Sequence, residues 1–286
     1  MKHVAVIGLG LMGGSLGLAL KHRGLAKVSA SGRRDETRRR ALERGAADTV
    51  FDSAREAVRG ADLVVFCTPV CSIPALAREC LDAFEPGCTI TDVGSTKADL
   101  TREMTALLSS SSCVFVGSHP MAGSEKTGME SARMDLYEGA TTVVTPAPGS
   151  PEASVAVVSG LWTRVGAKVI RTSPDDHDSA VARSSHLPHL TAALLTATAA
   201  RGLQPEFTAF CGTGFRDTTR VADGSPDMWH DIVKTNRSAI LGELRNYEGE
   251  LKALIESVEH RDFAAVKSFL ERARLLRRRI LGAEVE

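Results

Sequence analysis

His3-Val4-Ala5-Val6-Ile7-Gly8-Leu9-Gly10-Leu11-Met12-Gly13-Gly14-Ser15 is the stretch that decides the fold. Its apolar run, residues 3–7, predicts a buried parallel strand, and a helical pattern continues from the glycines to about residue 23. In this order Gly8 permits a tight turn, Gly10 lets the backbone approach a pyrophosphate, and Gly13 lets the helix pack near the strand. Glycine-rich turns also occur without ligands, but the strand–turn–helix context favours a dinucleotide site. We expect this site to be formed by Gly8, Gly10, Leu11, Met12 and Gly13.

Alternating strands and helices continue this pattern along the chain. Apolar strand candidates occupy residues 27–31, 62–67, 89–93, 113–116, 141–145 and 168–170. From residue 173 onward the pattern is helical, with long segments at about 174–201, 228–257 and 261–281. The sequence therefore predicts an α/β Rossmann-type, doubly wound parallel sheet in residues 1–172, followed by an all-α domain in residues 173–286.

Three polar turns follow successive strands at their carboxyl ends: Thr68-Pro69, residues 94–97, and Ser118-His119-Pro120. Because ligands of doubly wound sheets bind beyond the carboxyl ends of the strands, we expect these turns to converge on one crevice. The ring of Pro120 restrains His119 to extended geometry, and a histidine can accept a proton near neutral pH. A lone histidine is more often a loop or core residue, but this position favours a catalytic role.

The end of the second strand bears on the choice between NAD and NADP. NAD-binding domains usually place an acidic residue there for the ribose diol, whereas this sequence has Gly32-Arg33-Arg34. Arg33 and Arg34 suit the 2′-phosphate of NADP, because guanidinium groups bind phosphate in a bidentate manner. Asp35 is expected to cap the following helix instead. We therefore favour NADP over NAD.

Histidines and arginines cluster in the helical part. His177, His186 and His189 fall on one long segment, and the spacing of the last two allows them to share a helix face. Their spacing offers no third ligand for a metal, so we expect no metal site and interpret them as residues lining the crevice. Farther on, Arg216 and Arg220 could hold a carboxylate substrate, pair with nearby acidic residues, or do both.

Composition narrows the function classes. Thirty-five basic and thirty-five acidic residues give no net charge, which argues against nucleic acid or an anionic membrane as the main partner. The six cysteines show no CxxC pair and are expected to be free thiols in a reducing compartment. A signal-peptide pattern and an apolar run of membrane-spanning length are both missing, so a cytoplasmic location is expected.

Together, five motifs resemble the prephenate/arogenate dehydrogenase family, in the family's order and over nearly the whole chain. They are residues 8–15, Asp92-Val93-Gly94-Ser95-Thr96-Lys97, Gly117-Ser118-His119-Pro120-Met121-Ala122-Gly123-Ser124-Glu125-Lys126, Ser185-His186-Leu187-Pro188-His189 and Gly214-Phe215-Arg216-Asp217-Thr218-Thr219-Arg220. The resemblance implies oxidative decarboxylation of prephenate to 4-hydroxyphenylpyruvate with a nicotinamide cofactor, in tyrosine biosynthesis. Conversion of arogenate to tyrosine is the alternative.

The resemblance also implies roles for individual residues. His119 would take the proton of the ring hydroxyl, Ser95 would orient that hydroxyl, and Arg220 would bind the ring carboxylate. The helical domain would form a homodimer in which Trp229 reaches the neighbouring subunit's site. The remaining expected contacts are His177, His186, His189, Glu125 and Thr213 with the substrate, and Thr68 and Pro69 with the cofactor.

Two rival interpretations use the same layout. A β-hydroxyacid-type dehydrogenase would use a catalytic lysine, and Lys97 keeps that possibility open. An NADP-sensing binding protein would need an inert crevice, which three converging polar turns argue against. The chain ends near Glu286, so we expect no ACT or chorismate mutase domain, and any feedback by tyrosine would act at the active site.

Overall fold

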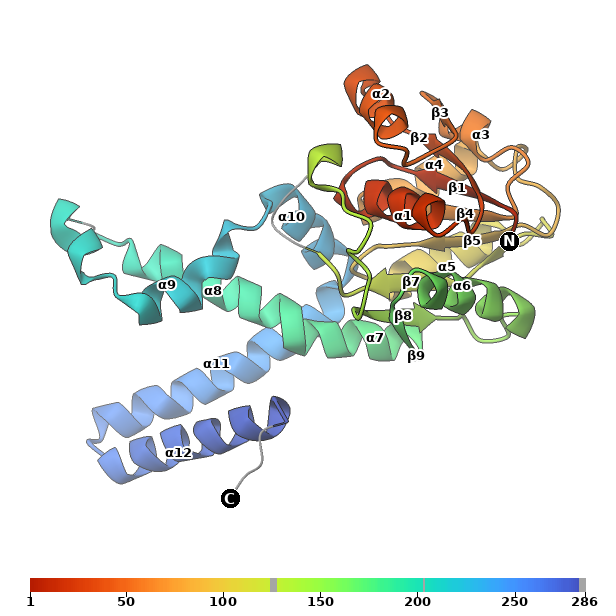
Figure 1. Cartoon of the computed structure of the whole chain (residues 1–286). Coiled ribbons are helices and arrows are strands. Elements are labelled where there is room, and N and C mark those ends of the chain that lie inside the picture. The colour runs from red at the N-terminus through yellow and green to blue at the C-terminus, as the bar shows by residue number, and fades with distance from the viewer. Residues whose placement is uncertain (124–127, 203, 283–286) are drawn as a thin grey trace. The chain divides into compact units, whose positions relative to one another are not determined.

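A computed structural model of the chain describes residues 1–123, 128–202 and 204–282. It consists of two compact units, residues 1–237 and residues 238–286. The first unit contains two β-sheets with their covering helices and the first part of the helical region (Figure 1). The predicted boundary at residue 172 lies inside this unit, because the helices that follow it pack against the sheet region; as a domain boundary it stays a prediction.

The main sheet has six parallel strands in the order β3-β2-β1-β4-β5-β6. Its strands are β1 (His3–Ile7), β2 (Lys27–Ser31), β3 (Thr49–Phe51), β4 (Leu63–Phe66), β5 (Thr89–Asp92) and β6 (Val114–Phe115). From β1 the chain adds strands toward one edge of the sheet (β2, β3) and then, from β4 onward, toward the other edge. This order is that of a doubly wound Rossmann fold. The predicted fold class is confirmed, although the short strand β3 was not predicted.

Side chains of β1 alternate between the two faces of this sheet. Val4 and Val6 join one hydrophobic cluster, whereas Ala5 and Ile7 join the other. One face is covered by α1 (Leu11–His22), α2 (Asp35–Glu43) and α6 (Glu152–Arg164). The opposite face is covered by α3 (Ala54–Ala57), α4 (Ile73–Glu79) and α5 (Ala98–Leu107). Burial on both faces explains the continuous apolar runs in the sequence.

A second, three-stranded sheet holds the histidine that was predicted to lie in a turn. Its strands are β7 (Gly117–Pro120), β8 (Thr141–Thr145) and β9 (Lys168–Arg171), in that order. β7 pairs antiparallel with β8, and His119 lies opposite Val143. The expectation of a loop at residues 118–120 was therefore wrong. Pro120 fits because β7 is an edge strand, where the missing amide donor is tolerated.

The helical region is more segmented than predicted. Its elements in the first unit are α7 (Pro174–Val181), the π-helical turn Ala182–His186, α8 (Leu187–Ala199), the 3-10 turn Pro205–Phe210, α9 (Thr213–Thr219), the 3-10 turn Arg220–Asp223 and α10 (Pro226–Thr235). The predicted helix at 228–257 is broken at Asn236, which ends α10 with a non-helical backbone. Both irregular positions, the π turn and Asn236, carry side chains of the candidate site.

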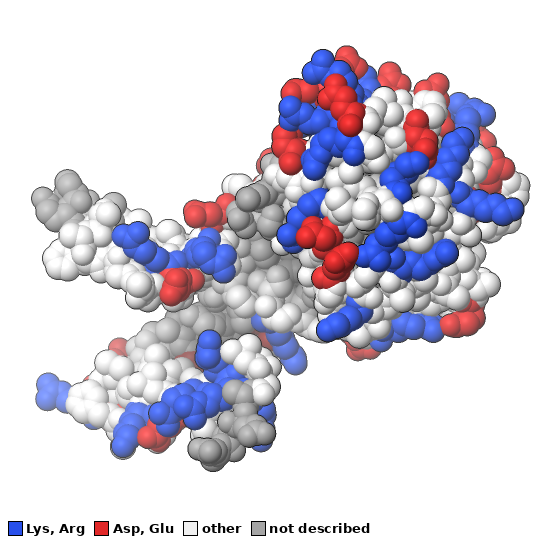
Figure 2. Space-filling view, in the orientation of Figure 1, with Lys and Arg blue, Asp and Glu red and all other residues white. Residues whose placement is uncertain are grey.

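The second unit is formed by α11 (Arg237–Glu259) and α12 (Phe263–Ile280). Arg261, with φ 56°, lies in the turn between these helices, and an ion pair of 2.7 Å joins Glu250 to Arg272. Apolar side chains on both helices are exposed, including Val258 and Leu270. Of the helices in the described part, none is long and apolar enough to cross a membrane. Acidic and basic side chains are interspersed over the face shown in Figure 2.

Candidate active site

The glycine turn after β1 has two glycines that the protein's own packing requires. Gly8 has φ +107°, and a Cβ there would lie 2.7 Å from the carbonyl oxygen of Cys67. A Cβ on Gly13 would lie 1.9 Å from the carbonyl oxygen of Gly8. At Gly10, by contrast, a Cβ would meet no protein atom within 4 Å. Internal packing therefore does not explain glycine at position 10, whereas close approach of a ligand to the start of α1 does.

Other residues expected at the cofactor site surround this turn. The Oγ1 atom of Thr68 is buried without a hydrogen-bond partner, and its Cγ2 would lie 2.9 Å from a Cβ on Gly8. A buried hydroxyl without a partner fits a ligand that accepts its hydrogen bond. Pro69 is exposed beside it. Leu11 and Met12 belong to the hydrophobic cluster or pack against it, so they would meet a cofactor mainly through their backbone.

At the end of β2, the side chains of Arg33 and Arg34 are exposed. Among the described residues no side-chain hydrogen bond or ion pair involves either guanidinium group, although Arg34 lies close enough to Glu130 to help lower the pKa of that carboxyl. Both guanidinium groups remain exposed, where an anion can reach them. The expected capping role of Asp35 was wrong. Arg34 occupies the N-cap position of α2, and the carboxylate of Asp35 forms an ion pair with Arg38 instead of bonding to backbone amides.

A buried ion pair holds the strand that carries His119. Lys97 and Asp92 are paired with their side chains fully buried. The Lys97 ammonium also donates to the carbonyl oxygen of Ser118 at 3.1 Å, and the Ser118 amide donates to Asp92 Oδ1 at 3.1 Å. Both contacts lie directly before His119 in β7. Because Lys97 is fully engaged inside the protein, it is not placed to act on a substrate, which argues against the β-hydroxyacid mechanism.

His119 begins a chain of hydrogen bonds that leads into the protein. Its Nδ1 lies 2.9 Å from Nε2 of His177, and Nδ1 of His177 lies 2.7 Å from Oδ1 of Asp178. The Asp178 carboxylate also accepts the backbone amides of Lys97 and Ala98, each at 2.8 Å, at the start of α5. The helical region and the sheet region therefore meet at this carboxylate.

Burial controls the protonation of His119. Loss of hydration lowers the pKa of its imidazole well below the usual value of about 6.5, and repulsion from the other titratable groups nearby, which include the Lys97 ammonium, lowers this pKa further. At neutral pH the imidazole is therefore uncharged and able to accept a proton.

His186 ends the π-helical turn and is 1% exposed. The side-chain amide of Asn236 donates to the carbonyl oxygen of Asp178 at 2.8 Å and contacts Nδ1 of His186 at 3.2 Å. Burial lowers the pKa of His186 to about 4. Because the carbonyl oxygen of Asp178 can only accept, the side-chain nitrogen of Asn236 is oriented toward both partners. Nδ1 of His186 therefore serves as an acceptor.

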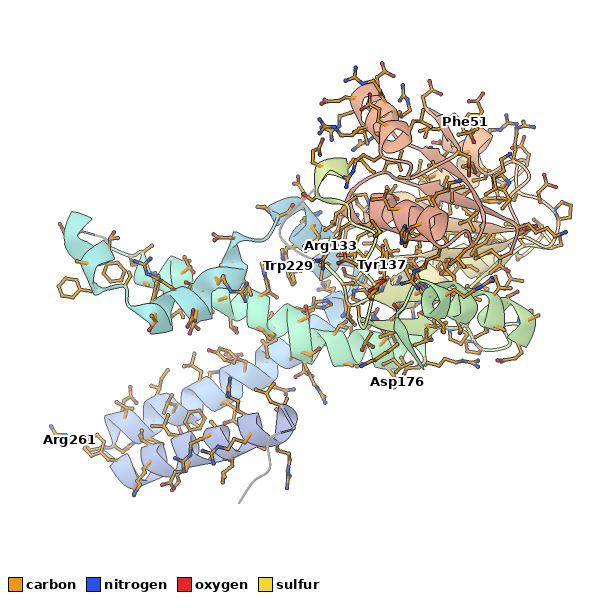
Figure 3. The ribbon with its side chains drawn as sticks, in the orientation of Figure 1. Phe51, Arg133, Tyr137, Asp176, Trp229 and Arg261 are labelled. Carbon is orange, nitrogen blue, oxygen red and sulfur yellow. The ribbon has the colours of Figure 1, made fainter. Side chains whose placement is uncertain are left out.

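His189 and Trp229 form an aromatic pair next to His186. Their rings stack with centroids 3.5 Å apart and an interplanar angle of 11°. The indole of Trp229, labelled on α10 in Figure 3, also meets the His186 ring edge-on at 5.9 Å. A Cβ on Gly224 would lie 2.6 Å from Trp229 Nε1, so only glycine allows this packing. The prediction that His186 and His189 share one side is confirmed by their common contact with Trp229.

The remaining expected residues lie around this cluster. Ser95 is half-buried in the turn after β5, and Arg220 is exposed in the 3-10 turn whose next residue, Val221, hydrogen-bonds through its backbone to His189. Thr213 is the exposed first residue of α9. Glu125 lies outside the described residues. The structure thus joins the three helical histidines, Trp229 and His119, and it places the turn that carries Arg220 next to His189 through Val221.

Two residues of this network were not among the predicted site residues. Asp178 links His177 to α5, and Asn236 links Asp178 to His186. A signal for Asp178 was its position directly after His177, but α7 also has two acidic residues in its first turn. No local pattern marks Asn236, since its role depends on a contact between distant segments.

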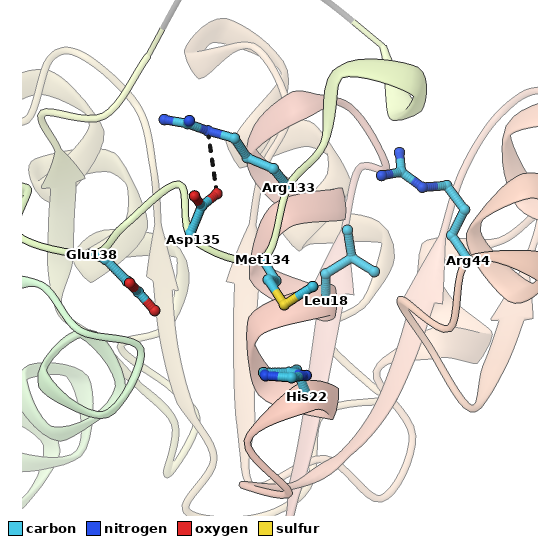
Figure 4. A pocket seen from close by; sticks show the side chains of 7 residues that line it. All are labelled: Leu18, His22, Arg44, Arg133, Met134, Asp135 and Glu138. Carbon is cyan, nitrogen blue, oxygen red and sulfur yellow. Dashed lines mark ion pairs between the residues drawn. The ribbon is translucent and has the colours of Figure 1, made fainter.

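A surface hollow lies apart from the histidine cluster, between the carboxyl-terminal half of α1 and the segment before β8 (Figure 4). It is lined by Leu18, His22, Arg44, Arg133, Met134, Asp135 and Glu138. Its charged groups are engaged: Arg133 pairs with Asp135, Glu138 pairs with Arg23, and Arg44 donates to the carbonyl oxygen of Ala132. This hollow is therefore no candidate for the reaction site. Within the described ranges, no three His, Cys, Asp or Glu side chains are grouped to hold a metal ion.

Comparisons with known proteins agree with this arrangement. Residues 16–171 match the family model described as the nucleotide-binding domain of prephenate dehydrogenase, and residues 173–272 match its dimerization domain. A prephenate dehydrogenase of Bacillus subtilis is 35% identical over 264 residues, covering 91% of this chain and 71% of that protein.

Solved structures give the same result. The prephenate dehydrogenase of Aquifex aeolicus, in complex with hydroxyphenyl propionate and NAD+, is similar with a TM-score of 0.90 and 30% identity over 98% of both chains. The arogenate dehydrogenase of Synechocystis gives a TM-score of 0.84 at 28% identity, over 97% of this chain and 99% of that one. The chain therefore belongs to the prephenate dehydrogenase family of NAD(P)-dependent oxidoreductases.

Proposed function

We propose that the protein catalyses oxidative decarboxylation of prephenate to 4-hydroxyphenylpyruvate with reduction of NAD(P), as a step of tyrosine biosynthesis. The observation that carries this proposal is the partly buried, uncharged His119 at the carboxyl edge of the sheet, in hydrogen-bond contact with His177. Family membership supplies the reaction class, and this histidine supplies a base able to work in it.

In this mechanism His119 removes the proton of the ring hydroxyl while hydride leaves the same carbon. Ser95 orients the hydroxyl, and Arg220 holds the ring carboxylate through its guanidinium group. The bond between this carboxylate and the ring then breaks, carbon dioxide leaves, and the electron pair completes the aromatic ring. The ring oxygen, which becomes a phenolate in this step, takes up a proton to give the phenol. Because aromatisation drives the reaction, the protein mainly has to position groups and hold charges. His186, His189 and Trp229 would exclude water from the substrate.

The nicotinamide cofactor, when bound, supplies the acceptor for the hydride. Gly10 and the first amides of α1 would hold its pyrophosphate, and the hydroxyl of Thr68 would donate to it. We further propose a preference for NADP. It is supported by the two exposed guanidinium groups of Arg33 and Arg34 at the end of β2, where NAD-specific domains place a carboxylate.

Arogenate is the second candidate substrate, because similarity to the Synechocystis arogenate dehydrogenase nearly equals that to the Aquifex prephenate dehydrogenase. The two substrates differ in the side chain, which is a keto acid in prephenate and an amino acid in arogenate. The test is an assay of each substrate with each of NAD and NADP, following absorbance of the reduced cofactor. We expect the fastest reduction with prephenate and NADP. Faster turnover of arogenate would select the second candidate, and no reduction in any combination would refute the proposal.

We also propose that the protein is a homodimer of cytoplasmic location. The match of residues 173–272 to a dimerization domain and the exposed apolar side chains of α11 and α12 support the homodimer. Six unpaired cysteines support a reducing compartment.

A further inference from the structure

The hydrogen bonds behind His119 have a direction, and that direction selects one of the two nitrogens of His119 as the base. This choice of nitrogen rests on the proposed role of His119 as the proton acceptor. The chain of hydrogen bonds starts at Asp178, passes through His177 and ends at His119, with contacts of 2.7 and 2.9 Å.

Asp178 fixes the start of this chain because its carboxylate can only accept. The carboxylate is 5% exposed, and its two oxygens take the backbone N–H groups of Lys97 and Ala98 at the N-terminus of α5. A helix N-terminus favours the ionised form of a carboxylate. The third hydrogen bond of this carboxylate joins Asp178 Oδ1 to His177 Nδ1 at 2.7 Å, and its proton therefore lies on the imidazole nitrogen.

The proton on Nδ1 of His177 leaves its Nε2 as an acceptor in the neutral ring. Nε2 lies 2.9 Å from Nδ1 of His119, and this contact needs one proton between the two nitrogens. That proton has to belong to His119 Nδ1. We propose that His177 and Asp178 are positioning residues that fix His119 in the Nδ1-protonated tautomer and so make Nε2 the nitrogen that accepts the substrate's proton.

A cationic His177 would reverse this order, since its Nε2 would then donate to His119. Two features oppose a cation there. His177 is 2% exposed, and Asp178 already accepts two other hydrogen bonds. Two other polar groups face this chain of hydrogen bonds. Asp92 is paired with Lys97, and the side-chain amide of Asn236 contacts Asp178 and His186. Burial and hydrogen-bond geometry at His177 therefore favour the direction that runs from His119 through His177 to Asp178.

This proposal changes the role of His177 that the sequence predicted. Both of its ring nitrogens are occupied inside the protein, so it does not bind substrate as a pocket-lining residue would. When His119 accepts a proton on Nε2, its Nδ1–H bond to His177 persists. The positive charge that forms on His119 is then connected through His177 to the carboxylate of Asp178. The same logic operates in catalytic triads, where a buried carboxylate fixes the tautomer of the base.

Nitrogen NMR of the full-length protein labelled with ¹⁵N-histidine tests the tautomer directly, because protonated and unprotonated ring nitrogens differ strongly in chemical shift. Of the eight histidines, His119 is assigned by the signals that vanish in His119→Asn. The proposal expects a protonated Nδ1 and an unprotonated Nε2 at neutral pH. The opposite pattern would overturn it. This readout is independent of activity, so it separates failure of the tautomer assignment from failure of the proposed function.

A pair of His177 variants tests the positioning role. His177→Phe removes the acceptor and should lower kcat by roughly tenfold to a hundredfold with little change in the KM for cofactor. His177→Gln offers a carbonyl oxygen to His119 Nδ1 and should recover part of the loss, together with the His119 nitrogen signals of the wild type. Equal losses in both variants, or unchanged His119 signals in His177→Phe, would contradict a positioning role.

Discussion

His119 combines two properties that a proton acceptor at neutral pH needs, an uncharged ring and a fixed orientation. Burial lowers its pKa, and the contact with His177 together with its place in β7 orients the ring. A low pKa weakens the base, but it keeps the ring deprotonated across the physiological range. The lowered pKa therefore makes His119 a weaker base that stays unprotonated at neutral pH.

The pH dependence of kcat/KM follows from this lowered pKa. In the proposed mechanism the free enzyme is competent when His119 is unprotonated, so we expect activity to be lost only as the pH falls through the folded pKa of His119. Because that pKa lies well below 6.5, we expect kcat/KM to stay level from pH 7.5 through 6.5, with the acid limb of the His119 titration well below 6.5. Initial rates in overlapping buffers measure this. A limb centred near 6.5 would mean that the base is a solvated histidine and not His119 in this environment.

Cofactor preference also belongs to the residue scale. A Cβ on Gly32 would lie 3.3 Å from Leu9 Cδ1, so a side chain fits there with a small shift of that methyl group. The variant Gly32→Asp with Arg33→Ala adds the carboxylate that binds a ribose diol and removes one guanidinium. We expect the ratio of kcat/KM for NADP over NAD to fall about tenfold to a hundredfold, the value of one charged hydrogen bond.

The matched control is Gly32→Ala with Arg33→Ala, which makes the same steric change without the carboxylate. It should lose activity with NADP but gain none with NAD. If both double variants behave alike, the carboxylate does not contact the ribose, and the interpretation of the β2 turn is wrong.

Residues whose local pattern carries a signal could be predicted from the sequence. Gly8 and Gly13 are such residues, because a turn and a close helix contact demand glycine there. His119 was predicted because it follows an apolar strand, and its catalytic role stays a prediction. Asp178 and Asn236 were missed, since their roles depend on contacts with α5 and with His186 that no local sequence shows. The exact role of His177 needed distances.

At the scale of elements, the site depends on irregularities in otherwise regular structure. A π-helical turn between α7 and α8 carries His186, and the break after α10 turns Asn236 toward it. π-helical turns inside helices are frequent at functional sites. Periodicity predicted one continuous helix over 174–201, because a single π turn changes the hydrophobic pattern very little. Strand β7 was missed for a similar reason: its glycine and proline favour a turn, and only pairing with the distant β8 makes it a strand.

Stability should decrease in mild acid because of the buried histidine on the π turn. The pKa of His186 is about 4 in the folded protein and about 6.5 when unfolded, so below pH 6.5 the unfolded chain binds a proton that the folded chain does not. The free energy of unfolding should therefore fall as pH drops from about 6.5 toward 4, by on the order of 3 kcal/mol from this residue. His119 acts in the same direction.

Urea unfolding at several pH values between 7.5 and 4.5 measures this loss. His186→Gln, which removes the titrating ring, should show a smaller dependence of unfolding free energy on pH. His260→Gln is the control, because His260 is exposed on α11's end and should leave the slope unchanged. Equal slopes in all three proteins would show that His186 is not buried as a neutral group.

At the scale of the whole molecule, the compact units and the family models divide the chain at different places. The family models match 16–171 and 173–272, whereas the compact units meet between residues 237 and 238. The difference arises because Asp178 binds the start of α5 and Thr235 hydrogen-bonds to Thr96, which ties α7 and α10 to the sheet region. Sequence periodicity shows where strands stop, but it does not show which helices pack onto the sheet.

The proposed homodimer predicts a role for the exposed apolar side chains of the second unit. Leu270 on α12 is 60% exposed in the single chain, and Leu270→Glu would place a charge in an apolar interface. We expect this variant to sediment as a monomer in analytical ultracentrifugation where the wild type sediments as a dimer. Ser268→Glu adds the same charge two residues away, about 200° around the helix, and should remain dimeric. A monomeric wild type would contradict the homodimer.

The central claim is that His119 is the base at a hydride-transfer centre, and comparison of His119→Asn with the wild type tests it most directly. His22→Asn serves as the control, since it removes an imidazole from the same compact unit at the hollow away from the cluster. With prephenate and NADP, His119→Asn should lower kcat by roughly two to four orders of magnitude while cofactor affinity stays unchanged, and His22→Asn should behave as wild type. Unchanged turnover in His119→Asn would contradict the account.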